Sequence, residues 1–235
     1  MIMRVKPFIV LFLVIGAFST LIDNAVAQSE PQQSVIVYVE FKPADTRVGS
    51  ELLQDLASTA NGSAGLVRFD VLQQIVRGNF FALSETWSNA QTFANFENSP
   101  AVQNIFTQLM RLVEAPLDER PGNLLAGTLN PRNEHAQARQ VFVITHVDVD
   151  PQFVGQVQPL LNTFVSDSLR DAGVQTFALV SQTPTANHFQ LVETFANQQA
   201  FDDHVSASHT VIFRTNADAS LGAPYDERLY HFVNR

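Results

Sequence analysis

The feature that most constrains this chain is an internal repeat with a constant offset of 108 residues. The hexapeptide APLDER (115–120) returns as APYDER (223–228), and the same offset aligns further identical residues without a gap. These pairs include Pro43 with Pro151, Gly65 with Gly173, Phe69 with Phe177, Gln74 with Gln182, Asn79 with Asn187, Phe81 with Phe189, Glu85 with Glu193 and Phe93 with Phe201. Such a period is too long for a solenoid repeat and suits a small domain. The sequence therefore predicts two tandem copies of one domain, over 34–126 and 140–235, joined by a polar linker over 127–139.

The first 27 residues have the pattern of a secretory signal peptide. Arg4 and Lys6 precede the apolar run FIVLFLVIGAF, and the small-residue motif Ala25-Val26-Ala27 follows it. The run is short for a bilayer span, and an uncleaved anchor is the alternative. The sequence contains no cysteine, which excludes a lipoprotein, a disulfide and a cysteine nucleophile. We expect a mature protein that begins near Gln28, is periplasmic or secreted, and has no membrane contact after cleavage.

The charge of the predicted mature chain is acidic. Removing residues 1–27 takes two of the 14 basic residues and one of the 23 acidic residues, which leaves 12 and 22 and a formal net charge of −10. Nucleic acids and anionic lipids bind clustered lysine and arginine. Neither is therefore an expected partner.

Apolar periodicity predicts the order β-α-β-β-α-β in each copy, which is the ferredoxin-like pattern. In the second copy, strands are expected over 141–149, 176–182, 188–195 and 228–233, with helices over 151–173 and from Asn197 onward. In the first copy, the corresponding strands are 35–41, 69–74, 79–87 and 124–129, and the helices are 52–60 and 97–115. A sheet of this kind carries helices on one face only. The expected fold class is therefore α+β, with the open sheet faces of two ferredoxin-like units covering each other.

The histidines are distributed unequally between the copies. Five of the six lie in the second copy, at His146, His188, His204, His209 and His231, and the sixth, His135, lies in the linker. At the constant offset, their counterparts in the first copy are Tyr38, Phe80, Phe96, Ala101 and Asn123. Imidazole is the side chain that titrates near neutral pH, so an acid–base site is expected in the second copy alone. The first copy is then a structural partner.

The positions of three histidines carry further expectations. His146 lies on the strand face opposite the stripe of valines that begins at Val141. His204 and His209 are five residues apart, so they can face one ligand only if the helix bends between them.

Charged residues that are repeated in both copies are predicted to be structural, because the first copy lacks histidine. This applies to Glu193, which repeats Glu85, and to the repeated hexapeptide. The hexapeptide is expected to fix the turn from the second helix into the last strand, with its arginine paired to a carboxylate. Trp87, the only tryptophan, is predicted to be a core aromatic residue.

Two segments resemble the strand-to-helix segment of the antibiotic biosynthesis monooxygenase family. ETFANQQAFDDHVSASHTVIF (193–213) contains the glutamate, the aromatic residue two positions later, and the histidines at 204 and 209. ETWSNAQTFANFENSPAVQNIF (85–106) is its counterpart in the first copy. The resemblance implies a pseudo-dimeric α/β barrel and the oxidation of phenols or quinols by molecular oxygen without metal, flavin or another cofactor. Related members degrade haem with an Asn, a Trp and a His, but neither copy contains both Trp and His.

These observations lead to the hypothesis of a secreted or periplasmic, monooxygenase-like protein that acts on a small aromatic, quinol-type compound. His204, His146 and His209 are the candidate bases for the phenolic proton. The expected apolar wall for the substrate consists of Phe177, Phe189 and Phe195.

Three questions stay open from the sequence. A binding or interaction module of the same fold would hold a small aromatic ligand without turnover. A two-histidine-one-carboxylate metal site could be formed by His146, His204 and His209 with Asp203. Association of chains into a homo-oligomer is also open.

Overall fold

The computed structural model describes residues 31–129 and 139–233. The predicted signal peptide lies outside these residues, as does most of the predicted linker. Within them, no helix combines the length and the apolar character needed to cross a bilayer.

Each copy of the repeat folds into one ferredoxin-like unit whose elements follow the predicted order. The first unit contains β1 (Gln33–Glu40), α1 (Thr46–Ala60), β2 (Leu66–Gln74), β3 (Phe80–Trp87), α2 (Ala90–Glu97), α3 (Pro100–Leu109) and β4 (Asp118–Thr128). The second unit contains β5 (Val141–Asp148), α4 (Val154–Ser168), β6 (Val174–Gln182), β7 (His188–Phe195), α5 (Gln198–Ser206), α6 (Ser208–Ala217) and β8 (Asp226–Phe232). Every strand and α-helix of the second unit begins 108 residues after its counterpart in the first.

The eight strands close into one antiparallel barrel in the order β1-β3-β2-β8-β5-β7-β6-β4. Two ladders join the units: β4 pairs with β6 from Gly122 to Thr128, and β2 pairs with β8 from Leu72 to Gln74. The first residues of the predicted linker therefore belong to the barrel. Closure removes the free sheet edges that would otherwise be exposed. The fold is thus the expected pseudo-dimeric α/β barrel, and the two sheets are joined by backbone hydrogen bonds as well as by packing.

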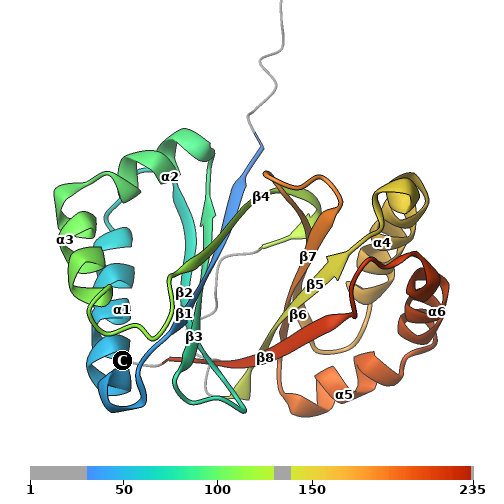
Figure 1. The fold of residues 1–235 in the computed structure, drawn as a ribbon. Coiled ribbons are helices and arrows are strands. Elements are labelled where there is room, and N and C mark those ends of the chain that lie inside the picture. Colours follow the sequence, from blue (N-terminus) through green and yellow to red (C-terminus); the bar gives the residue numbers. More distant parts are fainter. Residues whose placement is uncertain (1–30, 130–138, 234–235) are drawn as a thin grey trace, which may run out of the picture.

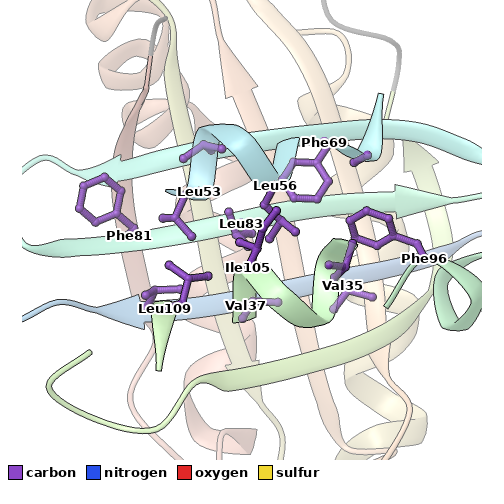
Figure 2. Packing of buried hydrophobic residues seen from close by; sticks show 14 of the residues in the cluster. Val35, Val37, Leu53, Leu56, Phe69, Phe81, Leu83, Phe96, Ile105 and Leu109 are labelled. Carbon is purple, nitrogen blue, oxygen red and sulfur yellow. The ribbon is translucent and has the colours of Figure 1, made fainter. Parts of the chain in front are cut away.

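The helices cover the outside of the barrel, with α1 to α3 on one side and α4 to α6 on the other (Figure 1). Strand residues alternate between the helix-covered face and the barrel interior. In β5, Val141 and Val143 belong to the core under the helices, whereas Phe142 and Ile144 belong to the interior of the barrel. In the first unit, Leu53, Leu56, Ile105 and Leu109 from the helices pack on strand residues that include Val35, Val37 and Leu83 (Figure 2).

The second predicted helix of each unit is in fact two helices, and the prediction of a continuous helix was wrong. In the first unit, α2 ends at Glu97 and α3 begins at Pro100, after Ser99 with an extended ψ of 141°. Proline lacks a backbone N–H and disfavours the helical conformation of the preceding residue. In the second unit, Ala207 holds the equivalent position with a ψ of 144°, so α5 and α6 meet at a bend. This bend decides where the histidines on the two helices point.

The repeated hexapeptide lies at the start of the last strand of each unit. The structure begins these strands at Asp118 and Asp226, earlier than the sequence indicated, so the Asp-Glu-Arg triplets lie within them. Arg120 Nη2 donates to Asp118 at 2.8 Å, and Arg228 Nη2 donates to Asp226 at 2.6 Å. The predicted pairing of each arginine with a carboxylate is confirmed.

Candidate functional site

Two of the predicted histidines meet at one carboxylate on the helix-covered face of the second unit. Nδ1 of His204, in the last turn of α5, lies 2.8 Å from Oδ2 of Asp171. Nε2 of His209, at the start of α6, lies 3.2 Å from the same oxygen. The bend at Ala207 turns both rings toward the loop between α4 and β6 that carries Asp171, and the ring centroids are 5.6 Å apart. The sequence analysis required a bend between the two histidines if both were to face one ligand, and the structure has that bend at Ala207.

The local sequence explains how these elements are held together. Gly173 has a φ of 84°, a conformation that glycine adopts without strain, where the chain turns from α4 into β6. The Gly173 carbonyl accepts the N–H of Ala196 at 2.8 Å, which ties this loop to the end of β7. Asn197 then caps α5 by accepting the N–H of Ala200 at 3.0 Å. The loop with Asp171 and the helix with His204 are therefore fixed against each other by backbone contacts.

Phenylalanine rings surround His204, whose side chain is 2% exposed. The ring centroids of Phe195, Phe177 and Phe164 lie 5.2, 5.4 and 5.6 Å from that of the imidazole. Phe213 of α6 stacks on Phe164 at 4.2 Å. Apart from Asp171 and the ring of His209, the imidazole is surrounded by apolar rings.

The structure brings two of the three predicted wall residues to the histidine. Phe177 and Phe195 contact His204, as described above. Phe189 is buried under the same helices but lies at the start of β7, at the opposite end of the strand from Phe195. Within the described residues it makes no ring contact with His204.

The protonation of His204 follows from its surroundings. Burial lowers the pKa of its imidazole below the ordinary value, and the hydrogen bond and charge of Asp171 oppose that shift in part. In the neutral ring, Nδ1–H donates to Asp171 and Nε2 carries the lone pair. Nε2 makes no hydrogen bond to any residue that the structure describes, so its lone pair is not engaged within the protein.

His146 lies on the other face of the sheet, inside the barrel. Neighbouring strands of the barrel are antiparallel, so β1 and β5, which are four strands apart, run in the same direction. The pseudo-twofold axis that relates the two units is therefore parallel to the barrel axis. Consequently Tyr38 and His146, equivalent residues of the two units, meet, with Oη and Nε2 2.6 Å apart. Arg120 Nη1 lies 3.2 Å from Nδ1, and because guanidinium only donates, the ring hydrogen lies on Nε2 and is donated to Tyr38. Burial and then the charge of Arg120 lower the pKa of His146 to about 4.

The remaining candidates are also separated from the Asp171 site. Asp203, the carboxylate considered for a metal set, is exposed on α5 and accepts a hydrogen bond from Gln199 at 2.8 Å. His188 lies 3.5 Å from a carboxylate oxygen of Asp148, and His231 is exposed on β8.

A second group of buried polar side chains begins next to the phenylalanine rings. Glu193 is the cross-strand neighbour of Phe177, and its Oε1 accepts a hydrogen bond from Thr145 at 3.3 Å. Burial and then the charge of Glu227 raise the pKa of Glu193 well above its ordinary value. Glu227 is itself paired with Arg214 of α6 at 2.5 Å. Glu193 is therefore a carboxyl group whose surroundings favour the neutral form, built into the same layer as the histidines.

The first unit has no equivalent of this site. At the constant offset, the positions of Asp171, His204 and His209 hold Ser63, Phe96 and Ala101. Trp87 packs on Phe96 with ring centroids 4.8 Å apart and donates its Nε1–H to Glu85 at 2.9 Å. Trp87 is fully buried, which confirms its prediction as a core residue.

Sequence reasoning missed Asp171, Phe164 and Phe213 as parts of the site. Asp171 lies 33 residues before His204, and no periodicity connects the two. The comparison of the two copies could have identified Asp171 and Phe164 as residues specific to the second unit, because Ser63 and Leu56 hold these positions in the first unit.

Comparisons with known proteins agree with this architecture. The sequence profile described as antibiotic biosynthesis monooxygenase matches the chain twice, at residues 33–108 and 140–214. A solved structure of a candidate monooxygenase from Fusobacterium nucleatum is similar with a TM-score of 0.78 at 13% identity, covering 88% of this chain and 94% of that one. A candidate monooxygenase from Lactobacillus acidophilus has a TM-score of 0.72 at 13% identity, with 86% and 94% covered.

An anthrone oxidase-like protein is similar with a TM-score of 0.65 at 8% identity, and the match covers 87% of this chain and 92% of that chain. At such identities these likenesses concern the fold. A search of curated proteins gave no match to the chain.

Proposed function

This chain belongs to the antibiotic biosynthesis monooxygenase family, and we propose that its second unit oxidises a small aromatic, quinol-type compound with molecular oxygen, without metal or flavin. The observation that carries the proposal is the Asp171–His204 pair within a layer of phenylalanine rings. A hydrogen bond of 2.8 Å fixes the tautomer, and the Nε2 lone pair is left for a proton. The names of neighbours with this fold, candidate monooxygenases and an anthrone oxidase-like protein, point in the same direction.

The proposed reaction asks little of the protein beyond a base and a dry environment. His204 Nε2 accepts the phenolic proton, and Asp171 stabilises the imidazolium that forms. The resulting phenolate is electron-rich and is oxidised by molecular oxygen. One oxygen atom enters the ring and the other leaves as water, so that a quinol and O2 give a hydroxyquinone and H2O. Phe177, Phe195 and Phe164 keep water away from the base and pack against an aromatic substrate.

The assignment of the other candidates follows from the same geometry. His209 lies 3.2 Å from the same Asp171 oxygen but makes no hydrogen bond to it, so no part in the proton transfer is assigned to it. His146 is assigned to the joint between the two units, because both its ring nitrogens are already engaged there. The predicted leader supports a periplasmic or secreted location for this activity.

Oxygen consumption with a series of hydroquinones tests the proposal. His204→Phe introduces the residue that the first unit carries at this position, and we expect a loss of rate of about 10²–10⁴-fold, as for removal of a general base. Asp171→Asn keeps the shape but weakens the control of the tautomer, and it should also reduce the rate. His231→Ala, which changes an exposed histidine, serves as the matched control and should leave the rate unchanged.

Two results would contradict the proposal. Equal rates in the wild-type and His204→Phe proteins would show that this imidazole is not the base. Hydroquinone binding by calorimetry without oxygen consumption would favour the alternative, a binding module of the same fold.

A further inference from the structure

We infer that Asp171, His204 and His209 also form a binding site for one divalent transition-metal ion, and that the bound ion inactivates the base. Three different elements supply the donors: the loop after α4, the end of α5 and the start of α6. Two imidazoles and a carboxylate are a donor set that zinc, copper, nickel and iron(II) all accept. The ion site stands on its own geometry, whereas its inhibitory effect rests on the proposed function.

The distances between the donor atoms suit a shared ion. The three atoms all lie within 4.8 Å of one another, and two of the separations are 2.8 and 3.2 Å. Ligands bound to zinc at about 2.1 Å in a tetrahedral arrangement are roughly 3.4 Å apart. The carboxylate contacts are already close to this value. The two nitrogens need to approach each other by less than about 1.5 Å, which small rotations of the rings allow.

The state of His209 provides an independent observation. Its Nε2 is buried and makes no hydrogen bond in the part of the chain that the structure describes, although Oδ2 of Asp171 is 3.2 Å away. A buried nitrogen without a partner is costly, and such groups are normally satisfied by protein, water or an ion. An ion between His209, His204 and Asp171 would satisfy this nitrogen and replace the Asp171–His204 hydrogen bond by two coordinate bonds.

The comparison of the two units shows that the donors occur together. The first unit has the same helix break at Ser99, so the bend itself belongs to the fold. It nevertheless carries none of the three donors, because its equivalent residues are Ser63, Phe96 and Ala101. Each chain should therefore bind one ion at this type of site, in the second unit.

Coordination changes the tautomer of His204. The ion takes the Nδ1 lone pair, so the hydrogen of the neutral imidazole moves from Nδ1 to Nε2. Nε2 then carries a hydrogen and has no lone pair for the phenolic proton. An ion and a basic Nε2 are mutually exclusive, and metal loading should stop the proposed reaction.

Calorimetric titration of the chelator-treated full-length protein with Zn²⁺ tests the site. We expect one equivalent to bind and to raise the midpoint of thermal unfolding, because the folded state alone presents the three donors together. The substitutions Asp171→Ser, His204→Phe and His209→Ala install the residues of the first unit. Each should lower the affinity for Zn²⁺ by at least about tenfold. Even residues that only hydrogen-bond to metal ligands typically change metal affinity by this much. His231→Ala should bind Zn²⁺ as the wild type does.

If His204→Phe disturbs the core, the Zn²⁺ affinity of the His209→Ala protein provides the test. His209 lies at the edge of the site with a side chain 20% exposed, so its replacement should not disturb the core. The absence of Zn²⁺ binding, or binding that none of the three substitutions weakens, would overturn the inference. Zn²⁺ binding without inhibition of oxygen consumption would overturn the inhibitory role. If Zn²⁺ binds as expected and no hydroquinone is oxidised, the ion site stands and the proposed function fails.

Discussion

Replacing Glu85 by glutamine should stabilise the protein at alkaline pH and leave it almost unchanged at pH 5. Glu85 is buried under the helices of the first unit and accepts the indole N–H of Trp87 at 2.9 Å. Burial is the main reason why its pKa rises from the ordinary 4.5 to about 8, and the Trp87 hydrogen bond opposes the rise. The carboxyl group is therefore neutral in the folded protein over a range in which it ionises in the unfolded chain.

The sign and the size of the effect follow from linkage. A folded-state pKa above the unfolded one means that the stabilisation is fully present below about pH 4.5 and is lost as the pH rises through about 8. A rise from 4.5 to about 8 corresponds to a loss of about 5 kcal/mol in the free energy of unfolding. Glutamine has the same shape, can accept the same hydrogen bond and does not ionise, so Glu85→Gln removes this loss.

Urea unfolding at pH 5 and pH 9, followed by tryptophan fluorescence, measures the effect. Trp87 is the only tryptophan and touches the mutated group, so its emission reports on this core directly. Glu114→Gln, at an exposed position, is the control for the removal of a carboxylate. If the wild-type and Glu85→Gln proteins lose the same stability between pH 5 and pH 9, then Glu85 is not held neutral in the fold and the reasoning is refuted.

Three further substitutions test other parts of the structure. Tyr38→Phe removes the acceptor of the buried ring N–H of His146 and should cost about 1–3 kcal/mol in urea unfolding, with the barrel retained by circular dichroism. Gly173→Ala should destabilise by about 1–3 kcal/mol, because φ is 84° and the new Cβ would lie 2.6 Å from Cβ of Ala200. Gly155→Ala, in α4, should instead stabilise by about 0.5–1 kcal/mol, because the new Cβ would meet nothing within 4 Å other than the adjacent residues and backbone of its own helix. Equal effects of the two glycine substitutions would contradict this account.

Patterns along the chain predicted the order of the elements and the barrel, although not the break in the second helix of each unit or the early start of the last strands. The constant offset predicts two copies, and the alternation that places Val141, Val143 and Val147 on one face, with Ile144 and His146 on the other, predicts a strand. The strand and helix predictions follow from rules that act over a few residues, because side chains on a strand alternate and those on a helix repeat every 3.6 residues. The asymmetry of the histidines between the copies was equally visible, and it directed attention to the second unit.

The site required the tertiary structure. Periodicity indicates that a face is buried, but it does not identify the side chains that bury it. His146 and His204 are equally buried as whole residues, yet His146 faces Tyr38 inside the barrel and His204 faces Asp171 under the helices.

The distance between Asp171 and His204 depends on how the loop after α4 packs against α5, and the direction of His209 depends on one extended residue, Ala207. These relations are set by the closure of the barrel and the packing of helices upon it, which join residues that no short-range rule connects.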